Sequence, residues 1–328
     1  MNSTYVRSGI ISLLMATFSA CGVSPTVSQE TDRRFLSIGT APPGGTFFVV
    51  GAALAEALNQ VEEGKRWRVT AESTKGTSEN IRRLANRELD IALANASISY
   101  FAVRGEGDWE GVQSISTIMT LAPNVALFIA PSSIGIRQLS DLRGRRVVLG
   151  PAGAGFELFV EPILQAHGLS YEDLSVLHAT QAGAVDLLAD GGAAAAFLGG
   201  GIPTASITQA SASQKIDFIP FDSEVRKKLI KDYPFFEAAT VPAGTYRNQR
   251  EDFEGLNVGS MHLIADAEAD PDLIYQITRI LFENGEQIAA RHPVGRFINA
   301  SNVIKDTGTK FHPGAIRYYR EIGIWDRD

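Results

Sequence analysis

From Arg34 onward, short apolar runs alternate with segments whose apolar residues recur at helical spacing, and this alternation limits the fold more than any other feature. Apolar runs at 35–38, 67–71 and 89–93 are typical of buried strands. The segment that carries Val50, Leu54 and Leu58 at helical spacing indicates a helix between the first two runs. Strand–helix–strand repetition favours parallel sheets with right-handed crossovers, so the sequence predicts an α/β fold.

A second unit of the same kind begins near 146, and its size is similar to that of the first. Because the C-terminal third is too short for a domain of its own, we expect it to pack back on the first unit. This predicts two lobes, 34–128 with 240–328 and 129–239, joined by chain crossings near 125–132 and 240–258 that act as hinges. In such folds, ligands bind between the lobes at the carboxyl ends of the strands.

Further strands and helices follow from the same alternation. Residues 193–198 are rich in alanine, which favours a helix, but their place in the alternation favours a strand. The expected strands lie at 146–149, 174–178, 193–198, 216–219 and 257–264, and the expected helices at 77–85, 156–164, 182–189, 203–210, 271–290 and 315–322.

The first residues have the pattern of a secretory signal. A short basic segment precedes an apolar stretch at 9–18, which is too short to span a bilayer. Small residues before Cys21 resemble a bacterial lipobox, in which the cysteine is acylated. We therefore expect a lipoprotein signal peptide at 1–20, a polar tether at 21–33 and a lipid anchor at Cys21 that holds an exported protein to the membrane. The alternative is an ordinary export signal with an incidental cysteine.

Charge and motif content argue against several other classes. Thirty Lys and Arg against 37 Asp and Glu give a net charge of −7, which disfavours binding to nucleic acid. One cysteine excludes an intramolecular disulfide and a Cys-rich metal site, and five histidines show no metal-ligand spacing. Neither a nucleophile elbow nor a phosphate-binding P-loop occurs. We expect no catalytic residue, metal or cofactor, although two lobes could still bring distant carboxylates together.

Three turns rich in glycine and hydroxyl residues stand where an expected strand meets an expected helix, at 39–46, 73–78 and 150–155. Free N–H groups at a helix N-terminus bind anions, and glycine lets a ligand approach the backbone. Each turn alone is more often an ordinary turn, but three that converge on one cleft favour an anion site. Lys75, the one cation in these turns, is either a partner for the anion or a solvated surface residue. The expected ligand-binding residues are Thr40, Gly44, Gly45, Thr46, Phe47, Ser73, Thr74, Gly76, Thr77, Asn95, Gly153, Ala154, Gly155, Phe156, Gly200 and Pro203.

Several short stretches, in a fixed order, carry a family resemblance. They are Ile38-Gly39-Thr40 with 44–45 and 51–55, the run 73–80 with Leu84, the run 139–147, Tyr233-Pro234-Phe235 with 242–246, and His312-Pro313-Gly314-Ala315 with Tyr318-Tyr319. Together they resemble the TAXI family, the extracytoplasmic solute-binding subunits of TRAP transporters, over about 35–322.

The resemblance implies a type II periplasmic-binding-protein fold of two α/β lobes joined by a hinge, with the ligand cleft between them. It implies a receptor, not an enzyme, that closes on a small organic acid or amino acid, glutamate and glutamine included. Its partner is then a membrane permease driven by an ion gradient, and we expect the receptor to be a monomer. A lipoprotein that presents its bound state to a sensor kinase, and an exported enzyme on the same fold, are the alternatives.

Two turns depart from the pattern of the family. Phe47-Phe48 stands where the family usually has two tyrosines, and Gly153-Ala154-Gly155-Phe156 where it usually has Gly-Ser-Gly-Thr. Each lost hydroxyl bond to a polar ligand is worth about 0.5–1.5 kcal/mol. We therefore hypothesise a ligand that is less polar at its far end, with its carboxylate held by N–H groups near 74–78 or 153–155. A cleft that no longer binds anything is the alternative.

Overall fold

The computed structural model describes residues 34–43, 45–60 and 67–327. The expected signal peptide and tether, with Cys21, and the expected site residue Gly44 lie outside the described residues. Within the described part of the chain, no helix combines the length and the apolar character that crossing a membrane requires.

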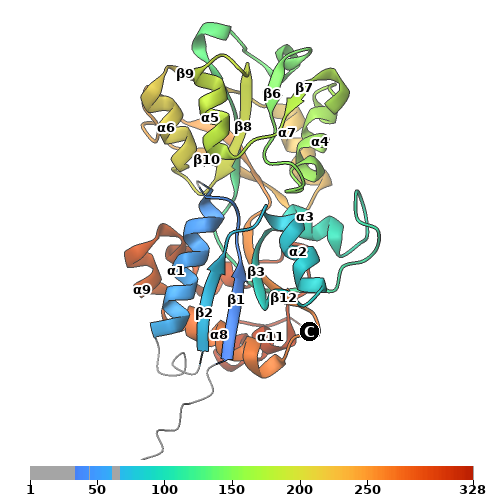
Figure 1. Ribbon diagram of the computed structural model, residues 1–328, viewed down its shortest axis with the longest axis vertical. Helices are drawn as coiled ribbons and strands as arrows, with labels where there is room; N and C mark the ends of the chain where they lie inside the picture. The colour runs from blue at the N-terminus through green and yellow to red at the C-terminus, as the bar shows by residue number, and fades with distance from the viewer. Residues whose placement is uncertain (1–33, 44, 61–66, 328) are drawn as a thin grey trace, which may run out of the picture. The chain divides into compact units, whose positions relative to one another are not determined.

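Two sheets organise the described chain, and each defines one lobe (Figure 1). The sheet of the first lobe has the strand order β2-β1-β3-β12-β4. Strands β2, β1 and β3 run parallel, and β12 is antiparallel to both β3 and β4. The strands are β1 (Arg34–Gly39), β2 (Trp67–Glu72), β3 (Ile91–Asn95), β4 (Ile115–Thr120) and β12 (Met261–Asp266).

The sheet of the second lobe has the order β10-β11-β5-β8-β6-β7, and β9 also pairs with β5. Strands β7, β6 and β8 run parallel, so their carboxyl ends meet at one edge, as those of β2, β1 and β3 do in the first lobe. The strands are β5 (Val125–Pro131), β6 (Arg146–Val148), β7 (Ser175–Leu177), β8 (Ala195–Gly200), β9 (Ile216–Ile219), β10 (Phe236–Val241) and β11 (Phe253–Val258).

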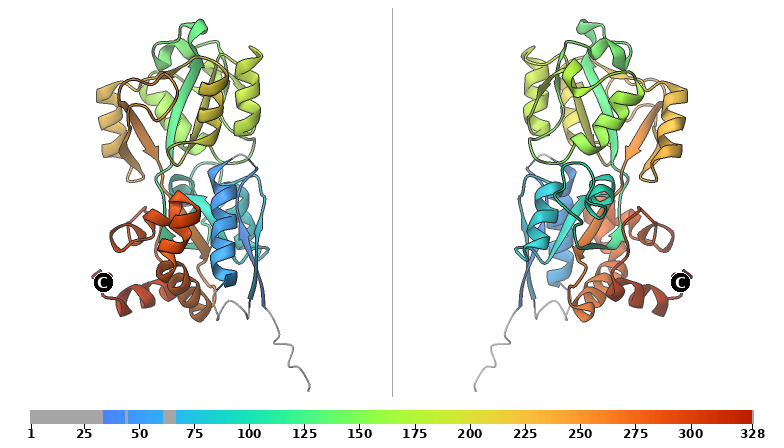
Figure 2. Two further views of the ribbon diagram at one scale, coloured as in Figure 1. Left: turned by 90° about the vertical axis from the view of Figure 1, so that its left-hand side faces the viewer. Right: turned by 90° about the vertical axis from the view of Figure 1, so that its right-hand side faces the viewer.

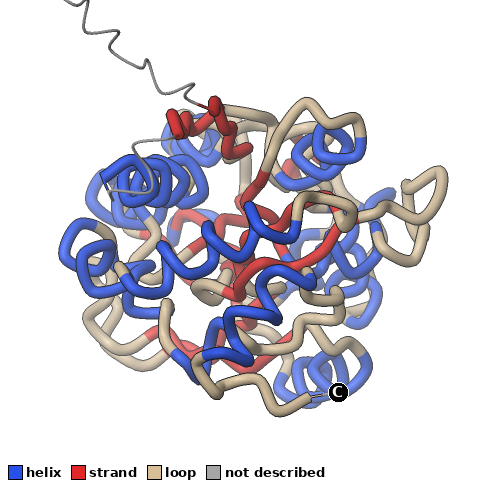
Figure 3. Tube along the Cα trace, turned by 90° about the horizontal axis from the view of Figure 1, so that it is seen from below, coloured by secondary structure: helices blue, strands red, loops and turns tan. Residues whose placement is uncertain are grey.

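Helices lie mostly outside the strands when the molecule is seen from below (Figure 3). Those of the first lobe are α1 (Thr46–Gln60), α2 (Thr77–Ala85), α3 (Ala96–Ala102), α8 (Pro271–Glu283), α9 (Gly285–Arg291), α10 (Ala300–Val303) and α11 (Pro313–Glu321). Those of the second lobe are α4 (Glu157–Ala166), α5 (Gln181–Ala189), α6 (Ala205–Ser213) and α7 (Ser223–Asp232). Short 3-10 turns are η2 (Ser132–Ile134), η3 (Leu139–Leu142), η4 (Tyr171–Asp173) and η5 (Pro293–Phe297).

The C-terminal segment from β12 onward returns to the first lobe, as its short length led us to expect. Figure 2 shows the orange and red helices beside the blue N-terminal strand. Tyr319 of α11 is fully buried, and its hydroxyl donates a hydrogen bond to the carbonyl oxygen of Ile118 at 3.0 Å. This contact ties the last helix to β4 across most of the length of the chain.

Sheet membership corrects the expected lobe boundaries at 128 and 240. Strand β5 belongs entirely to the second sheet, and so do β10 and β11, which pair with each other and with β5. The chain therefore crosses between the sheets at 121–124 and again at 259–260. The strand expected at 257–264 is in fact two strands, because Gly259, at φ +108°, turns the chain from one sheet into the other.

Four other differences concern helices and an edge strand. The single helix expected at 271–290 is interrupted at Asn284, the C-cap of α8 and the N-cap of α9. Helices α3 and α7 and strand β10 were not predicted. Helix α3 follows β3 with no turn between them, because Asn95 ends the strand and caps the helix by accepting a hydrogen bond from the N–H of Ser97. The alanine-rich segment is strand β8, as its place in the alternation predicts.

Candidate functional site: the cleft between the sheets

A cleft opens where the carboxyl ends of the parallel strands of both lobes face each other. It encloses about 710 Å³ of space, its open mouth included. The residues that line it are Ala41, Pro42, Pro43, Gly45, Thr46, Phe47, Lys75, Gly76, Thr77, Asn95, Ile98, Asn124, Ala126, Pro151, Phe156, Phe159, Thr180, Gln181, Phe197, Gly199 and Gly200.

Eight of the residues expected at the site line this cleft, and they come from both lobes. From the first lobe they are Gly45, Thr46, Phe47, Gly76, Thr77 and Asn95, and from the second Phe156 and Gly200. The other described candidates, Thr40, Ser73, Thr74, Gly153, Ala154, Gly155 and Pro203, are not among the lining residues.

The hydroxyl groups of Thr40 and Thr74 bind the backbone of their own lobe, which explains why they do not face the cleft. Thr40 is fully buried, and its Oγ1 donates to the carbonyl oxygen of Glu72 at 2.7 Å. The Thr40 carbonyl oxygen accepts hydrogen bonds from Thr74 Oγ1 at 3.0 Å and from Asn80 Nδ2 at 2.8 Å. These bonds join the ends of β1 and β2 to helix α2. The two threonines therefore support the first wall of the cleft from behind.

The N-terminus of α2 is fixed against the end of β3 by a buried hydrogen bond. Thr77 Oγ1 accepts the N–H of Asn95 at 3.0 Å, and both side chains are almost fully buried. The Asn95 side chain in turn donates to the carbonyl oxygen of Gly259 at 3.1 Å, in the second chain crossing. Thr77 and Asn95 thus form a rigid polar corner of the cleft, held to one of the two connections between the lobes.

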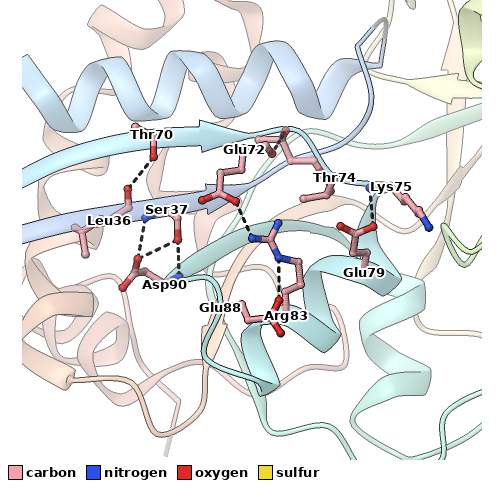
Figure 4. Close-up of polar contacts among 11 residues, drawn as sticks. Leu36, Ser37, Thr70, Glu72, Thr74, Lys75, Glu79, Arg83, Glu88 and Asp90 are labelled. Atoms are coloured by element: carbon pink, nitrogen blue, oxygen red, sulfur yellow. Dashed lines mark hydrogen bonds and ion pairs between the residues drawn. The ribbon is translucent and has the colours of Figure 1, made fainter.

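Lys75 carries the one charged side chain among the residues that line the cleft. Its backbone N–H donates to the Glu79 carboxylate at 3.2 Å, and Figure 4 shows the Lys75 side chain extending away from that carboxylate. Within the described part of the chain, the Lys75 ammonium makes no ion pair. Neighbouring charges are paired instead: Arg83 contacts Glu72 at 2.7 Å and Glu88 at 3.4 Å. Lys75 is both solvent-exposed and part of the site.

The Gly153–Gly155 turn of the second lobe faces protein atoms of the first lobe. The Ser78 N–H donates to the Ala154 carbonyl oxygen at 3.4 Å across the lobes. Gly155 has φ +89°, and a Cβ atom there would lie 2.2 Å from Ser78 Oγ and 3.1 Å from Ile98 Cδ1. The glycine is required here for its backbone conformation and for this close approach. The expectation that this turn contacts the ligand directly is therefore not met by the lining of the cleft.

Aromatic rings form the wall of the second lobe. Phe156, Phe159 and Phe197 line the cleft and contact one another, with ring centroids 5.2 Å apart for Phe156 and Phe159 and 5.9 Å for Phe159 and Phe197. Phe47 of helix α1 adds a fourth ring from the first lobe. The cleft therefore has a polar, positively charged end at α2 and an apolar body.

Three polar residues in the lining were missed from the sequence. Asn124 lies in the first chain crossing, where its N–H donates to Asn257 Oδ1 at 3.0 Å. Thr180 caps α5, and Gln181 Nε2 donates to the Gly199 carbonyl oxygen at 2.8 Å. The turn after β7 carried a signal, since Thr180 and Gln181 follow an expected strand and precede an expected helix. No sequence signal pointed to Asn124, because the first chain crossing was expected near 125–132 and so began one residue later.

Titratable groups with strongly shifted pKa values lie outside the cleft. His262 on β12 is fully buried, and burial lowers its pKa to about 3. Its Nε2 lies 2.8 Å from Ser99 Oγ, and its Nδ1 lies 3.4 Å from the hydroxyl oxygens of Thr117 and Thr307. The imidazole is therefore neutral and supports helix α3 from below.

Comparison with known proteins places this architecture. The chain matches the model of the NMT1-like family over residues 38–323. Among solved structures it is similar to the alkanesulfonate-binding protein SsuA from Xanthomonas axonopodis pv. citri, bound to MOPS, with a TM-score of 0.53 and 15% identity over 88% of this chain and 84% of that one. A structure described as a periplasmic transporter is similar with a TM-score of 0.54 and 13% identity over 88% of this chain and 92% of that one. At these identities the likeness shows the fold, which is the two-lobed α/β fold of periplasmic binding proteins.

Proposed function

Since the chain belongs to the NMT1-like family, we propose that it is an extracytoplasmic solute-binding receptor of the TAXI type. In this role it captures a small organic acid or amino acid between its lobes and delivers it to the membrane permease of a TRAP transporter. The observation that carries the proposal is the cleft itself, which both lobes build from strand ends and which contains one unpaired cation beside an apolar body. The resemblance of the turns to the TAXI family supports the transporter type.

The lining favours an organic acid over an amino acid. Lys75 supplies one positive charge, and among the described residues that line the cleft there is no Asp or Glu to pair with a ligand ammonium group. The anionic group is expected beside Lys75, Gly76 and Thr77, where the N-terminus of α2 adds a favourable dipole. The rest of the ligand lies against the phenylalanine rings. The similar alkanesulfonate-binding protein also takes an anion attached to an organic body.

Closure of the lobes is expected to follow from contact of the ligand with both walls. A ligand shifts a conformational equilibrium only by its difference in affinity for the two states. The hydrogen bond from the Ser78 N–H to the Ala154 carbonyl oxygen and the Tyr100–Phe235 ring contact at 5.2 Å already join the two lobes. A ligand held between Lys75 and Phe156 would add to these contacts only when the lobes are close.

Replacement of Lys75 by methionine tests the receptor and its anion site together. We expect Lys75→Met to weaken binding of a monocarboxylate about tenfold, or roughly 1.4 kcal/mol, because a charge-assisted contact is lost at an exposed site. Isothermal titration calorimetry against monocarboxylates, 2-oxo acids and amino acids measures the effect. Lys215→Met, an exposed lysine outside the cleft, is the matched control.

The outcomes of this titration test the anion site at Lys75 and the receptor function separately. Equal affinities for wild type and Lys75→Met would show that the anion sits elsewhere. Failure of every acid to bind, with no gain in thermal stability where about 2.7 kcal/mol is expected at 100 times the dissociation constant, would contradict the receptor. A neighbouring gene for a TRAP permease would support the transporter, and a neighbouring sensor kinase gene the sensing alternative.

We also propose that Cys21 is acylated and anchors the exported protein to the membrane. The small residues before Cys21 and the short apolar stretch at 9–18 support this. Growth with labelled palmitate should label the wild-type chain and leave Cys21→Ser unlabelled. Equal labelling of both chains, or of neither, would contradict the anchor.

A further inference from the structure

A second hollow lies beside the cleft and is also built from both lobes. It encloses about 1030 Å³, its open side included. From the first lobe it is lined by Val49, His292, Pro293, Val294 and Phe297, and from the second by Ile202, Pro203 and Ala205. None of its lining residues, all of which are described, is an Asp, Glu, Lys or Arg. We call it the apolar groove.

The cleft and the apolar groove share part of their walls. Gly45 and Thr46 line both. On the opposite side Gly200 lines the cleft and Gly201 lines the groove, so the boundary runs between Thr46 at the start of α1 and the end of β8. A Cβ atom at Gly200 would lie 2.3 Å from Thr46 Oγ1, which shows how closely the two segments approach.

This boundary is thin. On one side it consists of glycine backbone without side chains, and on the other of the single side chain of Thr46. Within the described part of the chain the Thr46 hydroxyl makes no hydrogen bond, so its rotation breaks no such bond.

We propose that the apolar groove binds the hydrocarbon tail of the ligand whose anionic group sits beside Lys75. The ligand is then an amphiphilic monoanion, a carboxylate or sulfonate with an extended apolar chain that passes Thr46 between the lobes. The inference rests on the proposed function and adds the chemical class of the ligand to it. Three observations carry it: the charge at one end of the cleft, the apolar lining of the groove and the wall that they share.

Affinity as a function of chain length tests the inference. Straight-chain carboxylates from propionate to decanoate are titrated into the purified chain by calorimetry. Burial of each methylene group is expected to tighten binding about fourfold once the chain reaches the groove. Ala205→Trp fills the groove, so the gain with length should disappear in that variant. Ala212→Trp makes the same substitution at an exposed position of the same helix, away from both hollows, and should keep the gain.

A second pair of variants keeps the test valid if Ala205→Trp does not fold, which its melting temperature reports. Val49→Asp places a charge in the groove and should remove the gain with length, whereas Val112→Asp, exposed and outside the groove, should not. The same length dependence in groove variants and controls, or no length dependence in the wild type, would overturn the inference and leave the groove open to a protein partner. If short acids still bound, the proposed receptor function would remain supported. If no acid bound, both the receptor function and the role of the groove would be contradicted.

Discussion

Residues of both lobes line the same cleft, yet different interactions hold its two walls in place. Behind the first wall lie buried polar groups: the Thr40 carbonyl accepts from Thr74 and Asn80, and Thr77 accepts from Asn95. The second wall consists of the packed rings of Phe156, Phe159 and Phe197, at and within α4 and β8 (Figure 1 shows these two elements). Hydrogen bonds fix the orientation of the polar groups that they join, whereas close packing of rings fixes the volume that the side chains occupy.

This difference indicates that the two walls have different roles in the proposed receptor. The polar wall fixes the orientation of the N–H groups that would meet an anion, and the aromatic wall shapes the space for the remainder of the ligand. Substitutions should therefore act differently on the two sides. Removal of buried side-chain volume should destabilise the second lobe most. Protonation of buried groups should destabilise the first lobe most.

Truncation of a ring in the second wall is expected to have the largest effect. Phe159 is 1% exposed and contacts both neighbouring rings of the wall. Phe159→Ala should lower the free energy of unfolding by about 3–5 kcal/mol, because it removes buried apolar surface and leaves a cavity. Urea denaturation measures the loss, and Phe159→Leu, which keeps most of the volume, should cost less than about 1.5 kcal/mol. A loss below that figure for Phe159→Ala would show that ring packing does not hold this wall.

The close approach of the lobes at Gly155 gives the next largest effect. A Cβ atom there would collide with Ser78 Oγ of the other lobe, so Gly155→Val should oppose closure by about 1–3 kcal/mol and weaken ligand binding about 10- to 100-fold. Gly153→Val is the matched control, since Gly153 also has a positive φ, +73°, but a Cβ atom there meets nothing within 4 Å. Both variants strain the backbone, and only the first should impair binding in calorimetry. Equal affinities for the two variants would contradict closure at this contact.

The glycine-rich turns of the two lobes show how far a sequence predicts a site. Alternation of apolar runs located the carboxyl ends of the parallel strands to within two residues, because burial on both faces of a parallel sheet imposes long apolar runs. It could not tell which hydroxyl groups are used internally. Thr40 and Thr74 look like ligand donors in the sequence, but each forms hydrogen bonds within its own lobe. Likewise Gly155 was expected to face a ligand, and it faces Ser78.

The aromatic wall was only partly predictable for a similar reason. Phe156 was expected at the site from its position beside a turn. Phe159 and Phe197, within an expected helix and an expected strand, were not, and both are almost fully buried. A residue can belong to the core and still border a cavity, and only the pairing of strands reveals which do. The lobe boundary was also only partly predictable. Pro123 interrupts the apolar stretch that contains β4 and β5, but the crossing was expected a few residues later, near 125–132.

The last effect is expected from pH, and it comes from His262, a buried residue of the first lobe that lies outside the cleft. Because the pKa of His262 is about 3 in the folded chain and about 6.5 when unfolded, the unfolded chain binds more protons between these values. The stability that His262 contributes is therefore complete above pH 6.5 and falls by about 1.4 kcal/mol per unit as the pH drops toward 3. Between pH 7 and pH 5 the wild type should lose about 2 kcal/mol more in urea denaturation than His262→Gln, which cannot take up this proton. Equal losses would show that the buried imidazole is not what makes the first lobe sensitive to acid, and that its hydroxyl partners Ser99, Thr117 and Thr307 accommodate the charge.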